Sequence, residues 1–178
     1  YWSAGGAEAL ATICANLAAM KGREINVYLP GYFCGQSLRY LRSLPVKLNF
    51  YPLDDELLPV YSKIGDSKAG WPVDIFIHVH YFGRIAGQQR SREFSDESGA
   101  ILIEDCAHII SPLVATVWKG DFLIFSPHKH FPLPKIGLVV VRKQFFVRKT
   151  DSPGHSPYFW LLKEILKKAR GVMPATEW

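Results

Sequence analysis

Short apolar runs, rich in β-branched and aromatic residues, alternate with helix-like segments along this chain. DIFIHVHYFG, residues 74–83, is a nearly continuous run of the kind that is buried on both faces of a parallel sheet. Composition and spacing predict further strands over 25–30, 46–53, 100–105, 120–126 and 137–143. They predict helices over 7–20, 35–44, 88–99 and 157–171. Because strands alternate with helices and the connections are short, we predict an α/β fold with a mostly parallel sheet.

The composition favours a folded domain outside the membrane. Of the 178 residues, 48% are hydrophobic and 13% aromatic, so the chain can bury a core and disorder is not expected. No apolar run approaches the roughly 18 residues that a membrane span needs, and no secretory leader is recognisable. Cys14, Cys34 and Cys106 lie far apart without a C-x-x-C pair. We expect buried, reduced thiols and a cytoplasmic protein.

The charge of the chain permits anionic partners. The formal net charge is +5 and the pI is about 9.1. The basic residues are spread out, except in KQFFVRK and KEILKKAR near the C-terminus. Zinc-finger spacing and an aromatic RNA-binding signature are both absent, so we expect no nucleic-acid partner. A phosphorylated small molecule would suit this mild positive charge equally well.

Polar side chains follow two of the predicted strands, and ligands of open α/β sheets bind beyond the carboxyl ends of strands. Glu104 and Asp105 end the run AILIED, and His108 follows three residues later. Ser126 and Lys129 follow the run FLIF. A strand-terminal aspartate is also common as a helix cap or turn former, so each position has an ordinary structural explanation as well.

Two glycines, Gly5 and Gly6, precede the helix predicted over 7–20. Backbone N–H groups and the helix dipole at such a start favour an anion such as phosphate. The same pair would also serve as a flexible helix start without any ligand.

Two pairs of histidines raise the question of a metal site. His78 and His80 alternate along one predicted strand, so they share a face. They have no acidic or cysteine partner at ligand spacing, and we expect no metal. His128 and His130 flank Lys129, and in an extended segment they would share one face, away from the lysine side chain.

A phosphate cradle, a strand-terminal carboxylate and a lysine on a later loop are together what pyridoxal 5'-phosphate (PLP) requires. The lysine forms a Schiff base with the aldehyde. The carboxylate pairs with the pyridinium nitrogen and keeps it protonated, so that the ring acts as an electron sink. The three features also occur in this order along the chain.

Several stretches resemble one known family. They are SAGGAEAL, VYLPGYFC, HVHYFG, ILIEDCAHI and GDFLIFSPHKHFPLPKIG. In register from about residue 3 to residue 143, they are similar to the DegT/StrS-like nucleotide-sugar aminotransferases, which are fold-type-I PLP-dependent enzymes. The acidic motif followed by a serine-lysine loop carries most of this resemblance.

The resemblance implies roles for individual residues. Lys129 would form the Schiff base and then move the proton in transamination. Asp105 would pair with the ring nitrogen, and His108 takes the place of the Gln or His near the ring oxygen. The phosphate would be bound by Ser126 and by the backbone of Gly5, Gly6 and Ala7. An aromatic residue stacks on the ring in the family, but the aligned position here is Cys34, so Tyr32 or Phe33 would have to substitute.

The resemblance also implies an architecture: a three-layer α/β/α PLP-dependent transferase large domain of the aspartate aminotransferase type. Residues 1–143 would form this PLP-binding large domain, truncated at its N-terminus. Residues 144–178 would be a linker and an amphipathic helix. The family's C-terminal small domain would be missing, because its members are roughly twice as long.

The implied function is transfer of an amino group from an amino acid, with glutamate as the expected donor, to a keto-sugar nucleotide through a Lys129 Schiff base. A homodimer is implied as well. One alternative is a sugar dehydratase of the same fold, in which His128 or His130 would act as the base. Another is a truncated, non-catalytic family member, which the single Gly137 at the end of the lysine loop would favour.

Overall fold

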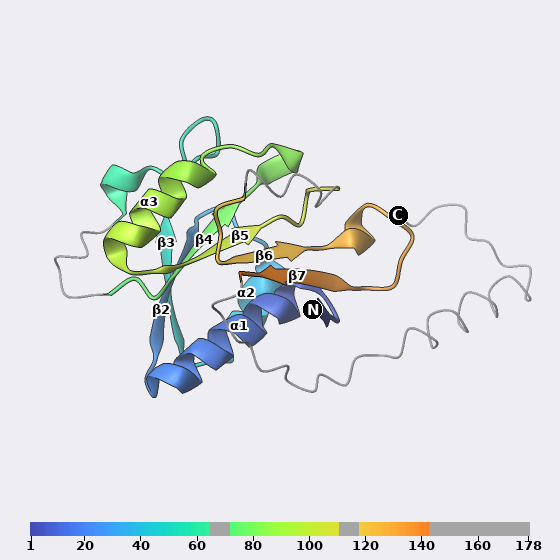
Figure 1. Ribbon diagram of the computed structural model, residues 1–178, viewed down its shortest axis with the longest axis horizontal. Coiled ribbons are helices and arrows are strands. Elements are labelled where there is room, and N and C mark those ends of the chain that lie inside the picture. The colour runs from blue at the N-terminus through green and yellow to red at the C-terminus, as the bar shows by residue number, and fades with distance from the viewer. Residues whose placement is uncertain (65–71, 111–117, 143–178) are drawn as a thin grey trace, which may run out of the picture.

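A computed structural model describes residues 1–64, 72–110 and 118–142. In these ranges a seven-stranded sheet has the order β1-β7-β6-β5-β4-β2-β3 (Figure 1). The strands are Trp2–Ser3 (β1), Ile25–Pro30 (β2), Val46–Tyr51 (β3), Ile75–Val79 (β4), Ile101–Asp105 (β5), Phe122–Phe125 (β6) and Gly137–Val141 (β7). Neighbouring strands from β3 to β6 run parallel, whereas β7 is antiparallel to both β6 and β1. The mostly parallel sheet is therefore confirmed.

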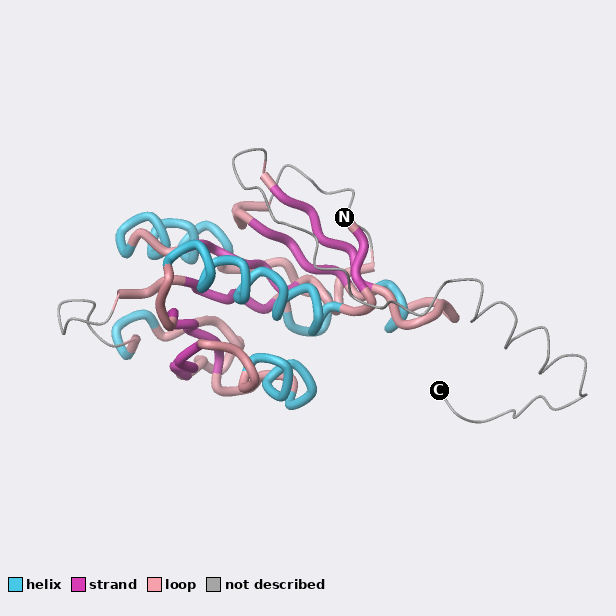
Figure 2. The backbone as a smooth tube through the Cα atoms, turned by 90° about the horizontal axis from the view of Figure 1, so that it is seen from below, coloured by secondary structure: helices cyan, strands magenta, loops and turns pink. Residues whose placement is uncertain are grey.

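Helices cover both faces of this sheet. They are Gly6–Lys21 (α1), Gly35–Leu41 (α2) and Gln88–Ser98 (α3), with 3₁₀ turns at Tyr61–Lys63 (η1), Tyr81–Gly83 (η3) and Pro127–Lys129 (η4). Figures 1 and 2 show α1 along one face of the sheet and α3 on the opposite face. The fold is thus the three-layer α/β/α arrangement that the sequence implies.

Alternation along the central strands supplies a core on each face. Ile75 and Ile77 of β4 belong to the cluster that contains Ile13 of α1. Phe76, between them, faces the other layer and packs against Phe94 of α3, with ring centroids 4.8 Å apart. Each such buried side chain contributes about 1.5–3 kcal/mol to stability. The run DIFIHVHYFG is apolar because its strand is covered on both faces.

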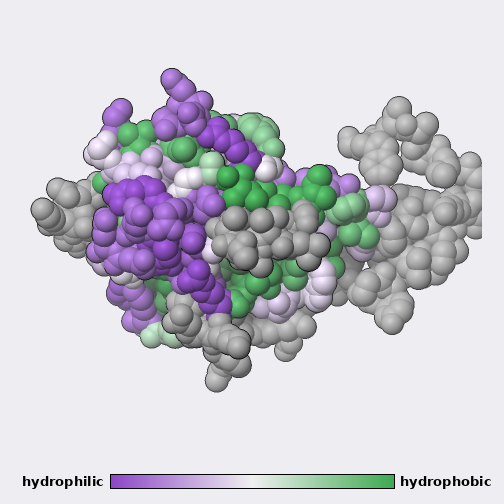
Figure 3. Space-filling model, turned by 45° about the horizontal axis from the view of Figure 1, so that its top comes forward, coloured by the Kyte–Doolittle hydropathy of each residue, from purple (hydrophilic) through white to green (hydrophobic). Residues whose placement is uncertain are grey.

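The outer face of α3 is solvated. Figure 3 shows hydrophilic residues gathered over this helix. Arg90 pairs with Glu93 and Glu97, both at 3.2 Å, and Arg92 pairs with Asp96 at 2.7 Å. The exposed pairs of Arg90 add only about 0.2–1 kcal/mol each. The polar composition of the helix predicted over 88–99 therefore reflects its exposure to solvent.

The run predicted as a strand over 74–83 is shorter than expected. β4 ends at Val79, and η3 follows it. Phe82 and Gly83 have positive φ values of 52° and 80°, which an extended strand does not allow. The turn that results brings the chain after β4 back toward the end of β5.

The helix predicted over 157–171 lies outside the described residues, as does the predicted segment 144–178. Nothing in the described ranges forms a helix that is both long enough and apolar enough to cross a bilayer.

Candidate active site

Two adjoining cavities lie at the carboxyl ends of β2, β4, β5 and β6, and we call them together the cleft. Their volumes are about 60 Å³ and about 250 Å³. Four residues line both: Cys34, Asp105, Ala107 and Lys129. β2 lies between β3 and β4, both of which follow it in the chain, so the strand order reverses here. Ligands of open α/β sheets bind at such a reversal.

The smaller cavity carries groups suited to an anion. α1 begins at Gly6 and runs for 16 residues, so its first N–H groups and the positive end of its dipole lie at this cavity. A Cβ on Gly6 would lie only 2.6 Å from Oγ of Ser126, which places this hydroxyl directly against the helix start. Gly6 and Ala7 line the cavity, and Gly5 lies behind them as the N-cap.

Gly137 ties the end of the lysine loop to the same turn. A Cβ there would lie 2.6 Å from the carbonyl carbon of Gly5 and 2.9 Å from the nitrogen of Gly6. No side chain fits so close to backbone atoms. The family's lysine loop usually ends on two glycines, but Gly137 alone makes the contact with the helix start here.

Asp105 faces the cleft because it shares a face of β5 with Ile103, which also lines the smaller cavity. Its Oδ1 accepts a hydrogen bond of 2.9 Å from the backbone N–H of Ala107. Burial raises the pKa of the Asp105 carboxyl above its ordinary value and outweighs the opposing effects of this N–H and of the Lys129 charge. A cation bound beside Asp105 would relieve this cost.

Lys129 ends η4 and is exposed in the cleft. The loop around it is a 3₁₀ turn and not an extended segment, so the expectation that His128 and His130 share a face is wrong. His128 Nδ1 donates to the carbonyl of Ile136 (2.8 Å), and His130 Nε2 donates to that of Ala107 (3.2 Å). The two histidines thus tie the loop on either side of Lys129 in the sequence to two different segments.

His108 lines the larger cavity. Its Nδ1 accepts a hydrogen bond of 3.2 Å from the backbone N–H of Phe82, and the two rings stack with centroids 6.0 Å apart. Burial and the Lys129 charge lower the pKa of His108, although the Asp105 charge opposes them. Because Nδ1 is an acceptor, the neutral ring carries its proton on Nε2, which is available as a donor.

Tyr32 and Phe33 also line the larger cavity. Tyr32 is 64% exposed, and its ring stacks on that of Tyr81 with centroids 5.7 Å apart. The Tyr81 hydroxyl donates to the backbone carbonyl of Tyr32. Both aromatic residues that could replace the family's stacking residue therefore line the cleft.

Cys34 is exposed, which corrects the expectation that all three cysteines are buried; Cys14 and Cys106 are. It is the N-cap of α2 and lines both cavities. Partial burial raises the pKa of the Cys34 thiol, but hydrogen bonds from the first turn of α2 and the charge of Lys129 outweigh it, and the net pKa is lowered. The position aligned with the family's stacking aromatic thus carries an accessible thiol.

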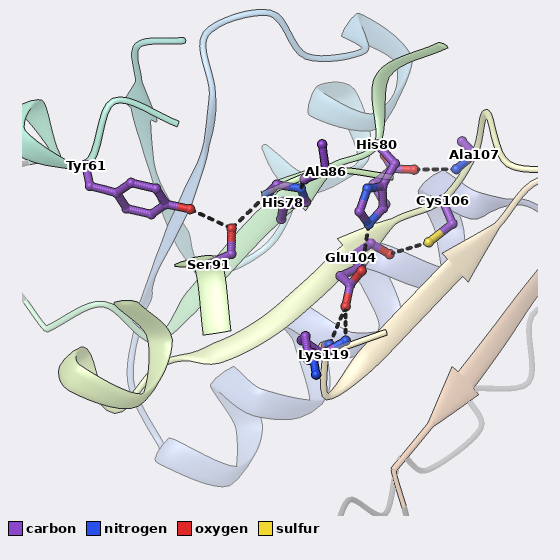
Figure 4. A network of polar contacts seen from close by, with 11 residues as sticks. Tyr61, His78, His80, Ala86, Ser91, Glu104, Cys106, Ala107 and Lys119 are labelled. Atoms are coloured by element: carbon purple, nitrogen blue, oxygen red, sulfur yellow. Dashed lines mark hydrogen bonds and ion pairs between the residues drawn. The ribbon is translucent and has the colours of Figure 1, made fainter. Parts of the chain in front are cut away.

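The other face of the sheet, behind Asp105, holds a buried polar network (Figure 4). His80 Nε2 lies 2.6 Å from a Glu104 carboxylate oxygen, and the backbone N–H of Lys119 donates to the other oxygen at 2.6 Å. His78 Nε2 donates to the carbonyl of Ala86 at 2.9 Å, so its Nδ1 accepts from the Ser91 hydroxyl at 2.7 Å.

Burial and the neighbouring His80 lower the pKa of His78 to about 4, so His78 is neutral at physiological pH. Among the described residues, no group of three or more His, Cys, Asp or Glu side chains is placed to hold a metal ion. His78 of β4 and His80, directly after it, each have a protein hydrogen-bond partner.

No protein-family model matches this chain, and no curated protein does. Solved structures do. A cysteine desulfurase from Thermococcus onnurineus NA1 is 23% identical, with a TM-score of 0.59 over 82% of this chain and 38% of its own. A PLP-bound presumed aminotransferase from Clostridium difficile 630 is 14% identical, with a TM-score of 0.62 over 94% and 45%. NtdA from Bacillus subtilis with bound PMP is 16% identical, with a TM-score of 0.58 over 79% and 32%.

The chain has the fold of the fold-type-I PLP-dependent transferases. At these identities the likeness shows the fold alone. The chain spans less than half of the length of each of the three proteins.

Sequence reasoning missed several residues of the cleft. Ala107, Gln36, Ser37 and Lys135 line it as well. Ala107 lies inside the quoted motif ILIEDCAHI and could have been proposed from it. Lys135 gives no such signal, because a lysine in a proline-rich loop is usually a solvated charge.

Proposed function

We propose that this chain binds PLP and is part of a PLP-dependent aminotransferase. The observation that carries the proposal is the convergence in one cleft of a lysine, a carboxylate at a strand end and an anion-binding helix start. The lysine is Lys129, the carboxylate is Asp105, and the helix start is the turn at Gly6 beside Ser126. Solved proteins with the same fold hold PLP or PMP.

The residues of the cleft fit this cofactor. The hydroxyl of Ser126 and the N–H groups of Gly6 and Ala7 would bind its phosphate, and only glycine fits against Ser126. His108 would donate from Nε2 to the ring oxygen. When bound, the cofactor would supply an electron sink for carbanion chemistry.

Asp105 would hold the proton on the ring nitrogen. Its carboxylate is buried without a full counter-charge, so its pKa is raised, and a protonated nitrogen beside it would be stabilised in turn. This reciprocity is a physical reason for a carboxylate at this position.

Lys129 would supply the amine that binds the cofactor's aldehyde and, once released, would carry a proton to and from the substrate carbon. It lines both cavities, whereas His128 lines only the smaller one and donates to a loop carbonyl. This difference favours Lys129 over a histidine base.

As substrates we propose an amino-acid donor, with glutamate as the first candidate, and a keto-sugar attached to a nucleotide. Support comes from the DegT/StrS-like motifs and from the net charge of +5, which suits anionic substrates. We also propose a homodimer on the same motifs.

A single-turnover experiment tests the aminotransferase proposal. The purified protein is loaded with PLP and given glutamate in the absence of a sugar. We expect stoichiometric release of the keto acid, and none from Lys129→Ala. Loading without keto acid release would contradict transamination. With a keto-sugar nucleotide, an amino-sugar product supports the proposal, and a deoxygenated sugar would indicate the dehydratase alternative.

A further inference from the structure

Lys135 lies at the anion end of the cleft. It lines the smaller cavity together with Gly6, Ser126 and Lys129. Its side chain runs across the helix start, with Cε only 2.9 Å from where a Cβ on Gly5 would lie. A second ammonium group is therefore present beside the first N–H groups of α1.

The charge of Lys135 is only weakly neutralised. Its Nζ lies 3.9 Å from a carboxylate oxygen of Glu8, beyond hydrogen-bond length, and 5.6 Å from the centre of the Tyr40 ring. That Glu8 oxygen accepts a long hydrogen bond of 3.3 Å from Tyr40. The other Glu8 oxygen, Oε2, is buried and has no hydrogen-bond partner in the described part of the chain.

Ser126 gives an independent indication of a ligand. The residue is 4% exposed, and its side chain points at the helix start. Its hydroxyl makes no hydrogen bond to any described residue, although it lines the cavity. The hydroxyl therefore has a free hydrogen-bond donor at the wall of the cavity, and a ligand oxygen bound there would accept it.

We propose that Lys135 is a ligand of a dianionic phosphate group bound between Ser126 and the start of α1, and that Glu8 holds the lysine there while competing for its charge. The inference rests on the proposed function insofar as the phosphate belongs to PLP. A phosphate dianion is a stronger partner for an ammonium group than a carboxylate 3.9 Å away.

The test compares three probes on the purified apo protein by calorimetry: inorganic phosphate, PLP and pyridoxal, which lacks the phosphate. We expect Lys135→Gln to weaken phosphate and PLP roughly tenfold, the size of one charge-assisted hydrogen bond. Pyridoxal binding should not change. Glu8→Gln should strengthen phosphate and PLP binding, because the competing charge is removed.

Lys63→Gln is the matched control, since it removes the same charge from η1, which does not line the cleft. Lys135→Arg should restore most of the affinity for phosphate. Lys135 is half exposed, so its variants are expected to fold, and their unliganded melting temperatures check this.

Unchanged phosphate and PLP affinity in Lys135→Gln would overturn the inference, as would equal losses in Lys135→Gln and Lys63→Gln. Failure of the proposed function looks different. In that case phosphate still binds in a Lys135-dependent manner, but PLP binds no more tightly than phosphate and does not react with Lys129.

Discussion

At the scale of single residues, the site contains glycines packed so closely that a larger side chain would clash with neighbouring atoms. Gly6 is the clearest case, since a Cβ would lie 2.6 Å from Oγ of Ser126. Gly6→Ala should destabilise the protein by about 1–3 kcal/mol through overpacking and should weaken phosphate binding. Chemical denaturation measures the first effect and calorimetry the second.

Gly35→Ala is the control for that substitution, because a Cβ at Gly35 meets nothing within 4 Å. Its stability should be unchanged or raised by about 0.4–1 kcal/mol. Adding Ser126→Gly to Gly6→Ala should restore stability but not phosphate binding. Equal stability of the two alanine variants would show that the close contact is not real.

Asp105 is expected to cost stability before any cofactor binds. Its folded pKa is raised, so its contribution to stability is fully present below the unfolded pKa of about 4 and is lost as pH rises through the folded pKa. Asp105→Asn keeps an oxygen for the Ala107 N–H but removes the charge. The apo variant should therefore melt at a higher temperature than the wild type at pH 7.

The gain should shrink as pH falls through the raised folded pKa of Asp105 and should vanish below the unfolded pKa of about 4, where the wild-type carboxyl is protonated in both states. Asp55→Asn, at an exposed site, should change the melting temperature little at either pH. A lower melting temperature of Asp105→Asn at pH 7 would contradict the proposed state of this carboxyl.

At the scale of elements, the buried pair of His80 and Glu104 joins the end of β4 to β5, and Glu104 also holds the segment before β6. Removing one partner of a buried pair costs about 3–5 kcal/mol, and Glu104→Gln should lose this much. Glu97→Gln, an exposed pairing on α3, should lose less than about 1 kcal/mol. Urea denaturation measures both.

The pH dependence of that loss has a definite sign. Burial raises the pKa of Glu104, but His80 and two backbone N–H groups outweigh it, and the net pKa is lowered. Its contribution is present above the unfolded pKa of about 4.3 and is lost as pH falls through the folded pKa. The difference between wild type and Glu104→Gln should shrink in acid. A stability difference between wild type and Glu104→Gln that grows in acid would contradict a lowered pKa of Glu104.

The elements themselves were largely predictable, because burial on both faces leaves a clear apolar signal in β4, β5 and β6. The period of two also separates Glu104 from Asp105, since neighbours on a strand face opposite layers. The partners of Glu104 were not predictable, because its contact with His80 depends on the register between β4 and β5. Similarly, Gly137 meets Gly5 only through pairing of distant segments.

Loops were predicted less well than strands. The turn at Phe82 requires a positive φ that its sequence does not signal, and the 3₁₀ turn at Lys129 replaces an expected extended segment. Cys34 is exposed because it caps α2 at the cleft and does not lie within the core. Local propensity alone does not determine such positions, since tertiary contacts hold them.

At the scale of the whole molecule, the described residues form one sheet, and the cleft at the carboxyl ends of its strands brings together a helix start, a carboxylate and a lysine. The central claim is that Lys129 is the residue that binds the PLP aldehyde. The most direct measurement reduces the PLP-loaded protein with borohydride and locates the added mass by peptide mapping. We predict the label on Lys129, and its absence in Lys129→Ala. A label on Lys135 or on any other lysine, with Lys129 unmodified, would contradict the account.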